Sequence, residues 1–396
     1  MTRELNRTRL SQLAQSLEMS ATMAAAHSGD RMGCDSLQPI SLAIGEPAEP
    51  PAQIIIEEVS RAARAGETRY GPAAGLPELR HLIAEDQRRK SGMQRSAEEV
   101  IVTAGGKPAL ADGLRCLIDP GDEVIVLAPY WPSFLQQVRL AGGIPRVVAP
   151  GPDLLPVPDR VAAACNERTR LLILNDPNNP TSRTLGKDLL SSLGRLAHEH
   201  DLWILADQVY GDLVLEGSHR SVLTVDPDLR SRTLLVESFS KRFAMTGYRL
   251  GCAIGPASVI QAMTRMATAQ TTCANLLAQR AGIAALTMGT SWSETQRSRY
   301  LRRRDEMATG LQALGCELHM RPEAAFYLFF RPPHEDDDLR FTSELQASQN
   351  VLLTPGTAFG CPGHVRISYG AGDAVLAEAL SRVETFISSR KRAESA

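Results

Sequence analysis

Short apolar segments alternate with helical stretches over residues 100–253 and predict a mostly parallel β-sheet. Each run rich in Val, Ile and Leu is followed by turn residues and then by a helical stretch, which is typical of parallel strands joined by helices. The predicted strands are Val100–Thr103, Glu123–Leu127, Leu171–Leu174, Trp203–Ala206, Leu234–Val236 and Gly251–Ile254. Because α/β proteins build ligand sites at the carboxyl ends of such strands, functional residues are expected there.

The chain on either side of this block has a different pattern. Leu10–Ser28 and Ser291–Leu314 predict helices, and the run Arg302–Arg304 is expected on a solvated face of the second. Further strands and a closing helix are predicted at Gly315–Arg331, Val351–Leu353, Val365–Tyr369 and Ala374–Ser389. We expect an α/β protein with a large domain (46–290) of mostly parallel sheet flanked by helices. Segments 1–45 and 291–396 would form a smaller α+β domain.

Composition and charge indicate what kind of partner the chain binds. The chain has 396 residues, 43% of them hydrophobic and 22% charged, which is ordinary globular composition. Its net charge of -2 does not favour binding to nucleic acid or to anionic membranes, so small-molecule partners are expected. No secretory signal, membrane span, disulfide framework or metal site is indicated, and a cytoplasmic location is predicted.

A lysine motif follows one of the predicted strands. Ser238–Lys241 carries two hydroxyls beside the lysine, and Arg249 lies eight residues further on between two glycines. This pattern suits a Schiff-base lysine next to a phosphate site. A surface lysine and arginine would also fit the motif taken alone.

A second motif, Gly105-Gly106-Lys107-Pro108, ends a predicted strand and opens a helix. Free backbone N–H groups and the helix dipole would face an anion there, which predicts a phosphate cradle. A nucleotide P-loop needs Ser or Thr after the lysine and a glycine five positions before Gly106, where this chain has Pro108 and Ile101. We therefore reject the NTPase interpretation.

Together these motifs resemble the aspartate aminotransferase family, the class I and II aminotransferases among fold type I enzymes that use pyridoxal 5′-phosphate (PLP). The resemblance runs from about Ile40 to the C-terminal helix. Its remaining motifs follow in the family's order: Gly45-Glu46-Pro47, Tyr70-Gly71, Pro120–Val124, Pro129-Tyr130-Trp131, Asn175–Thr181, Ala206–Tyr210 and Val365–Ser368.

The resemblance implies a role for each cofactor residue. Lys241 would hold PLP as a Schiff base and act as general base, with Asp207 facing the pyridine nitrogen. Asn179 and Tyr210 would bind the phenolic oxygen, and Trp131 would stack on the ring, although ordinary core packing also explains a tryptophan there. The phosphate would be bound by Gly105, Gly106, Lys107, Ser238, Ser240 and Arg249, and by Tyr70 of a neighbouring subunit, which implies a homodimer with shared sites.

Substrate binding follows from the same resemblance. Arg366 would bind the α-carboxylate as a bidentate fork, with Gly45, Asn175 and Trp131 as further contacts. The chain departs from the family at Ser182, where glycine is usual, at Gln208, where glutamate is usual, and at Thr271–Asn275. No second basic residue can be assigned to an acidic side chain, so aspartate specificity is not assumed.

The expected function is transamination between an L-amino acid and a 2-oxo acid. Elimination or replacement, decarboxylation or oxidation on the same cofactor, as in specialised biosynthesis, is the alternative, because nearly the same residues serve all these outcomes. A PLP-binding regulator is disfavoured because the segment before Ile40 is too short and insufficiently basic for a DNA-binding module.

Overall fold

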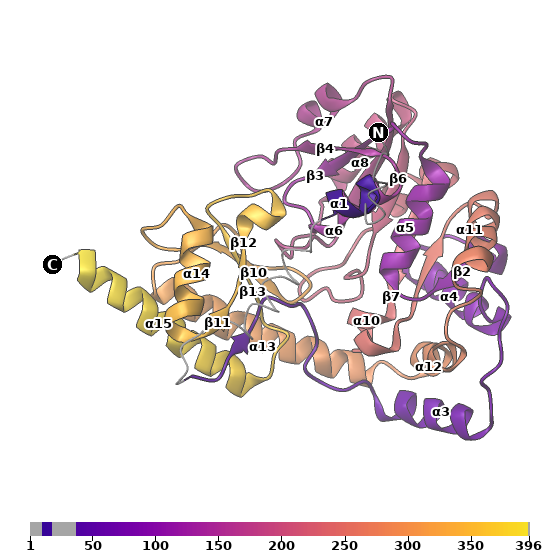
Figure 1. The fold of residues 1–396 in the computed structure, drawn as a ribbon. Helices are drawn as coiled ribbons and strands as arrows, with labels where there is room; N and C mark the ends of the chain where they lie inside the picture. The colour runs from indigo at the N-terminus through magenta and orange to yellow at the C-terminus, as the bar shows by residue number, and fades with distance from the viewer. Residues whose placement is uncertain (1–9, 18–36, 395–396) are drawn as a thin grey trace, which may run out of the picture.

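The computed structural model describes residues 10–17 and 37–394 of the chain. Its largest sheet has seven strands in the order β2-β8-β7-β6-β5-β3-β4 (Figure 1). The strands are β2 (Val100–Thr103), β3 (Glu123–Leu127), β4 (Ile144–Val148), β5 (Thr169–Asn175), β6 (Trp203–Asp207), β7 (Thr233–Ser238) and β8 (Gly251–Ile254). From β4 to β7 all neighbours are parallel, whereas β8 is antiparallel to both β7 and β2. The predicted α/β class with a mostly parallel sheet is confirmed.

One strand of this sheet has no counterpart in the predicted set. β4 lies at the edge, and most of its residues are exposed or half-buried. It contains Pro145 and Arg146, which edge strands tolerate because only one side pairs with a neighbour. The strand therefore lacks the continuous apolar run by which the other strands were predicted.

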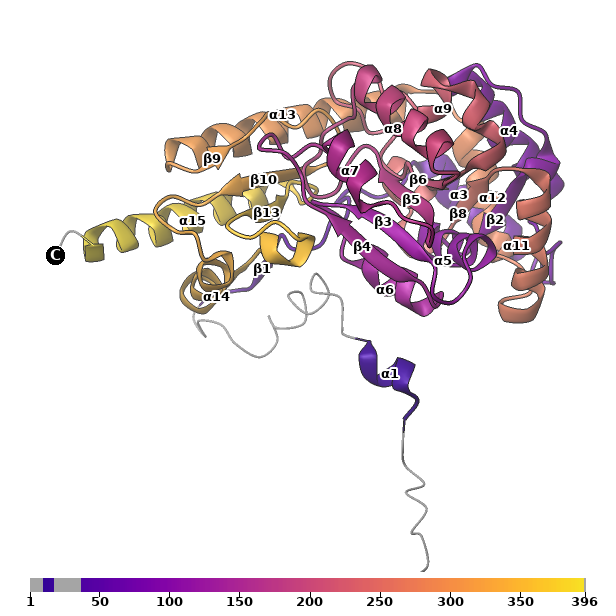
Figure 2. The ribbon, with the colours of Figure 1, turned by 90° about the horizontal axis from the view of Figure 1, so that it is seen from above.

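Helices cover both faces of the large sheet (Figure 2). They are α3 (Gln53–Arg64), α4 (Pro77–Ser91), α5 (Gly106–Leu117), α6 (Ser133–Leu140), α7 (Pro158–Ala164), α8 (Lys187–Glu199), α9 (Val222–Val225), α10 (Phe239–Arg242), α11 (Ala257–Gln270) and α12 (Leu276–Thr287), with 3-10 turns η1 (Ala97–Glu99), η2 (Pro227–Arg232) and η3 (Thr246–Tyr248). Helices α5, α6 and α11 pack on one face, and α4, α8 and α12 pack on the other.

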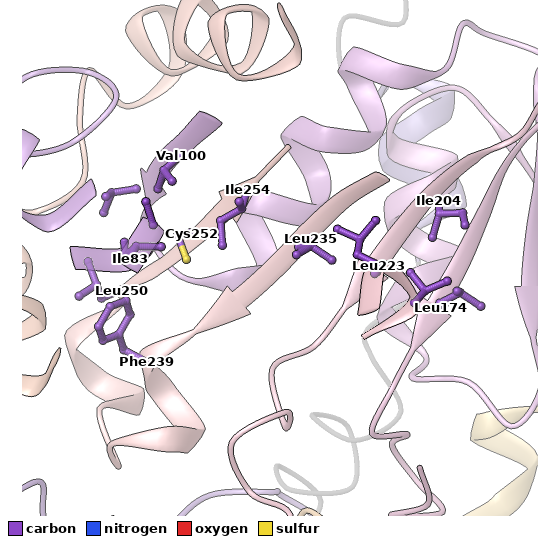
Figure 3. Close-up of a cluster of buried hydrophobic side chains, with 14 of the residues drawn as sticks. Ile83, Val100, Leu174, Ile204, Leu223, Leu235, Phe239, Leu250, Cys252 and Ile254 are labelled. Atoms are coloured by element: carbon purple, nitrogen blue, oxygen red, sulfur yellow. The ribbon is translucent and has the colours of Figure 1, made fainter. Parts of the chain in front are cut away.

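Alternate residues of each central strand enter different cores. Leu172 and Leu174 join the cluster under α4, α8 and α12, whereas Leu171 and Ile173 join the cluster under α5, α6 and α11. Figure 3 shows part of the first cluster, in which side chains from several strands lie in one apolar layer. Because both faces are covered, the strands are apolar at consecutive positions instead of alternating with polar ones.

A second set of elements lies beside the large sheet. Its four-stranded antiparallel sheet has the order β12-β13-β10-β9, and β1 (Ile40–Ser41) pairs in parallel with β11 (Val351–Leu352). The other elements are β9 (Glu317–Leu318), β10 (Tyr327–Arg331), β12 (Thr354–Pro355), β13 (Val365–Ser368), α13 (Ser291–Ala313), α14 (Asp338–Gln349), η4 (Gly356–Phe359) and α15 (Asp373–Glu394). Domain boundaries at residues 45 and 290 stay a prediction. Of the predicted helix Leu10–Ser28 only α1 (Gln12–Ser16) is seen, and residues 18–28 lie outside the described part.

The prediction that Arg302–Arg304 lies on a solvated helix face is wrong for two of the three arginines. Arg303 is buried, with Nη2 2.5 Å from Glu49 and Nε 2.6 Å from Asp373. Arg304 is fully buried and donates to Glu216, Asp305 and the carbonyl oxygen of Pro322. Apart from Asp305, the residue next to Arg304, these acceptors lie outside α13, so the local charge pattern could not reveal them.

Within residues 10–17 and 37–394, no helix combines the length and apolar character needed to cross a bilayer.

Gly251 makes the fold sensitive to a single added methyl group. A Cβ at this position would lie 2.5 Å from the carbonyl carbon of Gly105 and 2.6 Å from the backbone nitrogen of Gly106. We predict that Gly251→Ala lowers the free energy of unfolding by roughly 1–3 kcal/mol, because backbone cannot move aside as a side chain can. Urea unfolding measures the change.

Gly289→Ala is the matched control, since a Cβ there meets no described atom within 4 Å. Equal unfolding midpoints for the two variants would contradict the prediction.

Candidate active site

A cavity of about 340 Å³ opens at the carboxyl ends of the central parallel strands. Asn175, Asp207 and Ser238 are the last residues of β5, β6 and β7, and all three line it. Neighbouring parallel strands end at the same edge of the sheet, so their final side chains are brought together. The predicted site residues that line the cavity are Gly45, Gly106, Lys107, Trp131, Asn175, Asn179, Asp207, Tyr210, Ser238, Ser240, Lys241, Arg249 and Arg366.

Lys241 lies in the short helix α10, directly after β7. Ser238 caps this helix, and its Oγ accepts a hydrogen bond from the backbone nitrogen of Ser240 at 3.2 Å. Lys241 Nζ donates to the carbonyl oxygen of Gly45 at 2.5 Å. Burial lowers the pKa of Lys241 to about 8, although Glu46 opposes the shift. The amine is therefore easily obtained in its neutral, nucleophilic form near neutral pH.

Asp207 is a buried carboxyl at the end of β6. Burial raises its pKa to about 7, and a hydrogen bond from the backbone nitrogen of Val209 at 3.2 Å opposes the rise. A buried carboxylate gains most from a nearby cation, because in the protein interior little else compensates its charge. Asp207 therefore fits a cationic ring nitrogen.

Arg366 lies in β13 and is buried. Its Nη1 donates to Asn179 Oδ1 at 2.8 Å, and Nη2 donates to the carbonyl oxygen of Ala43. The guanidinium lies 4.5 Å from the ring centre of Tyr327 and 4.8 Å from that of Phe359. Its Nε is buried without a hydrogen-bond partner among the described residues. A fixed guanidinium that is not fully paired is suited to bind an anion.

The N-terminus of α5 lines another part of the cavity. Gly105 has φ +105°, and a Cβ there would lie 2.6 Å from Arg249 Nη2, so glycine makes room for the guanidinium. Arg249 Nη1 donates to the carbonyl oxygen of Thr246 at 2.8 Å. The loss of hydration and the nearby Arg249 lower the pKa of Lys107. Backbone N–H groups and the Arg249 guanidinium together fit a phosphate dianion.

Trp131 and Asn175 line the cavity and also contact neighbouring residues of the protein. Trp131 packs edge-on against Phe134 with ring centres 5.4 Å apart, so cavity lining and core packing both apply to it. Asn175 Oδ1 accepts from the backbone nitrogen of Asn179 at 2.8 Å, and its Nδ2 donates to the carbonyl oxygen of Asp207 at 3.3 Å. Asn175 therefore braces the loop that carries Asn179.

Gly105 and Tyr70 are the two predicted site residues outside the cavity lining. Gly105 contributes by leaving space for Arg249, whereas the side chain of Tyr70 is 85% exposed. Within a single chain Tyr70 therefore makes no contribution to the cavity.

Tyr327 lines the cavity and was assigned no role from the sequence. Its hydroxyl oxygen lies 2.6 Å from that of Tyr210, and its ring contacts Arg366. The only signal was a tyrosine inside the apolar run Phe326–Phe330, because a buried hydroxyl needs a partner.

Comparison with known proteins identifies the family. The sequence profile of aminotransferase class I and II matches residues 38–383. The chain belongs to this family. This aminotransferase is 40% identical over 379 residues to the aspartate/prephenate aminotransferase of Thermus thermophilus, covering 94% of this chain and 97% of the relative. It is 34% identical to the aspartate aminotransferase of Streptomyces avermitilis, covering 97% of each chain.

Solved structures agree with the sequence comparison. The aminotransferase superposes on the Thermus thermophilus aspartate aminotransferase with maleate at a TM-score of 0.89, with 39% identity over 95% of this chain and 99% of the other. The Thermotoga maritima aspartate aminotransferase gives a TM-score of 0.90 at 33% identity, over 96% of this chain and 100% of the other. The predicted family, fold type I architecture, aminotransferase activity and PLP dependence are thus confirmed.

Lys241 predicts a pH dependence of stability in the cofactor-free protein. Its pKa is about 8 in the folded chain against 10.5 for an ordinary lysine, so burial of the charge costs stability below pH 8. As the pH rises towards 10.5 the unfolded chain binds more protons than the folded one, and this cost disappears. We compare the free energy of unfolding of the wild type with that of Lys241→Met. The wild-type value minus the Lys241→Met value should rise by roughly 1–3 kcal/mol between pH 8 and pH 10.5.

Urea unfolding at several pH values measures the difference. The control is Lys187→Met at the exposed start of α8, where the difference should stay flat. A flat difference for Lys241→Met would show that the lysine is not desolvated.

Proposed function

We propose that this aminotransferase transfers an amino group between an L-amino acid and a 2-oxo acid, with PLP held on Lys241 as a Schiff base. The observation that carries the proposal is that one cavity joins a lysine of lowered pKa, a buried acid and a buried, incompletely paired arginine. Each of these groups is costly to bury alone, and together they match the charges of a cofactor and its substrate.

The cofactor residues have distinct tasks in this proposal. PLP, when bound, supplies a ring that accepts electrons from Cα of the substrate. Asp207 keeps the ring nitrogen protonated, and Asn179 and Tyr210 donate hydrogen bonds to the phenolic oxygen. Arg249, Ser238, Ser240 and the N-terminus of α5 at Gly105-Gly106 bind the phosphate, and Trp131 covers one face of the ring.

Lys241 moves the proton and Arg366 orients the substrate. A neutral Lys241 amine accepts the proton from Cα, and its pKa of about 8 makes that form accessible near neutral pH. Arg366 binds the α-carboxylate through its guanidinium, already fixed by Asn179 and Ala43, with Gly45 and Asn175 beside it. A fixed carboxylate determines which Cα bond faces Lys241.

The proposal includes a homodimer with shared active sites and a cytoplasmic location. Arg249, which is proposed to bind the phosphate, is exposed in the single chain, and Tyr70 is 85% exposed, which supports a second subunit covering this part of the cavity. The six cysteines in the described part of the chain are free, in keeping with a reducing compartment.

A single-turnover assay tests the reaction. PLP-loaded enzyme given one amino acid and no 2-oxo acid should release one 2-oxo acid per active site and keep the amino group as pyridoxamine phosphate. Lys241→Ala should release none, since the proton acceptor is gone. Release of ammonia or carbon dioxide, or oxygen uptake, in place of pyridoxamine phosphate would favour elimination, decarboxylation or oxidation.

The proposed substrate class is an acidic amino acid. Relatives are named for aspartate and prephenate, and four cationic side chains line this cavity against one carboxylate, Asp207. Arg366, Arg249 and Lys241 have the tasks given above, which leaves Lys107. Its ammonium lies 4.9 Å from the ring centre of Trp131. We propose that Lys107, predicted from the sequence to bind phosphate, meets the distal carboxylate of the substrate.

Lys107→Gln tests whether Lys107 binds the distal carboxylate of the substrate or the phosphate of the cofactor. If Lys107 binds the substrate side chain, kcat/KM for aspartate should fall about 10-fold or more, as for loss of a charged hydrogen bond, while that for alanine stays within about 2-fold. Steady-state kinetics with both donors measures this, with Lys187→Gln on the exposed start of α8 as control. Equal losses for both donors, together with weaker PLP binding, would assign Lys107 to the phosphate.

A further inference from the structure

Two buried tyrosine hydroxyls meet at the edge of the cavity. The oxygens of Tyr210 and Tyr327 lie 2.6 Å apart, and both side chains are buried. Each hydroxyl has one proton to donate and can accept further hydrogen bonds, so only one of the pair donates to the other. Which one donates depends on where Tyr210 directs its own proton.

We propose that Tyr327 is a positioning residue that donates to Tyr210 and thereby strengthens the hydrogen bond from Tyr210 to the cofactor's phenolic oxygen. This inference rests on the proposed function, which has Tyr210 donating to that oxygen. Once its proton points there, the Tyr210 oxygen can only accept from Tyr327. Consecutive hydrogen bonds polarise one another, so a donor that itself accepts a hydrogen bond donates more strongly.

Neighbouring residues hold the Tyr327 hydroxyl in place. A Cβ at Gly45 would lie 1.7 Å from the Tyr327 oxygen, so only glycine leaves room for the hydroxyl there. Ser182 Oγ accepts a hydrogen bond from the backbone nitrogen of Tyr327 at 3.2 Å. The Ser182 carbonyl oxygen also accepts from the backbone nitrogens of Glu323 and Ala324, each at 3.0 Å. The loop after Asn179 is thus fastened to the start of β10.

Ser182 occupies a position whose backbone conformation favours glycine. It is fully buried and adopts φ +57°, a left-handed conformation that costs a residue with a Cβ more than glycine. The hydrogen bond to Tyr327 compensates part of that cost. The serine therefore adds a restraint on Tyr327 that glycine does not provide.

Tyr327 contacts the substrate side of the cavity through its ring. The ring centre lies 4.5 Å from the Arg366 guanidinium, which is close enough for a cation–π interaction. The hydroxyl and the ring thus face different groups. A change to phenylalanine removes the contact with Tyr210 and keeps the contact with Arg366.

Burial keeps both hydroxyls protonated. It is the largest cause that raises the pKa of Tyr210, and Tyr327 raises it further. Burial likewise raises the pKa of Tyr327, whereas Arg366 opposes the rise. Both side chains therefore remain hydrogen-bond donors at physiological pH.

The test is a spectrophotometric pH titration of PLP-loaded Tyr327→Phe. The measured midpoint reports the proton on the nitrogen that joins Lys241 to the cofactor. Weaker donation from Tyr210 leaves more negative charge on the phenolic oxygen beside that proton. The midpoint should therefore rise by roughly 0.3–1 pH unit. KM for the amino donor should stay within about 2-fold, because the ring still supports Arg366.

Tyr210→Phe in the same titration tests the role of Tyr210 separately from that of Tyr327. It should raise the midpoint more than Tyr327→Phe; an unchanged midpoint would refute the proposed role of Tyr210 itself. If Tyr210→Phe moves the midpoint and Tyr327→Phe does not, the inference about Tyr327 is overturned.

Two further variants complete the test. Ser182→Gly, which suits the left-handed backbone, should shift the midpoint in the same direction by a smaller amount and keeps the inference testable if Tyr327→Phe fails to fold. An unchanged midpoint in Ser182→Gly would count against the role given to the serine. Tyr300→Phe is the control, a buried tyrosine of the same core outside the cavity lining. A shift there equal to that of Tyr327→Phe would overturn the inference.

Discussion

The cavity depends on a positive charge that is buried before any substrate arrives. The guanidinium of Arg366 contacts the N-terminal segment at Ala43, the loop after β5 at Asn179 and the strand β12 at Thr354. Among the described residues none of its hydrogen-bond partners is acidic, so its desolvation is compensated by neutral oxygens and aromatic faces alone. An incoming carboxylate supplies the missing charge. The same contacts hold together three segments that are distant in the sequence and that border the cavity.

Much of the arrangement could be predicted because it follows from local pattern and strand direction. Parallel strands end at one edge, so residues that follow the apolar runs were expected to meet there, and Asn175, Asp207 and Ser238 do so. The family motifs added residues that pattern alone could not place, such as Arg366, which reaches the cavity from a different sheet.

The features that escaped prediction depend on partners far away in the sequence. Edge strand β4 was missed because its exposed side contributes no apolar run. Arg304 was expected in solvent because two of its acceptors, Glu216 and Pro322, lie outside its own helix. Tyr327 was overlooked since nothing in its neighbourhood indicates that its hydroxyl meets Tyr210, more than a hundred residues earlier in the chain. Local sequence reports which side chains are apolar, whereas the partner of a buried polar group is decided by the tertiary fold.

Arg303 has a consequence for how this sequence can diverge. The arginine is buried between Glu49 and Asp373, so it forms one electrostatic unit with two acids near opposite ends of the chain. Replacing either acid by a neutral residue leaves the guanidinium partly uncompensated, whereas replacing all three by apolar residues of matching volume removes the charge altogether. Glu49 and Arg303 are expected to change jointly along a lineage, whereas Asp373 keeps a partner when Arg303 is lost, because it also pairs with Arg302 at 2.6 Å.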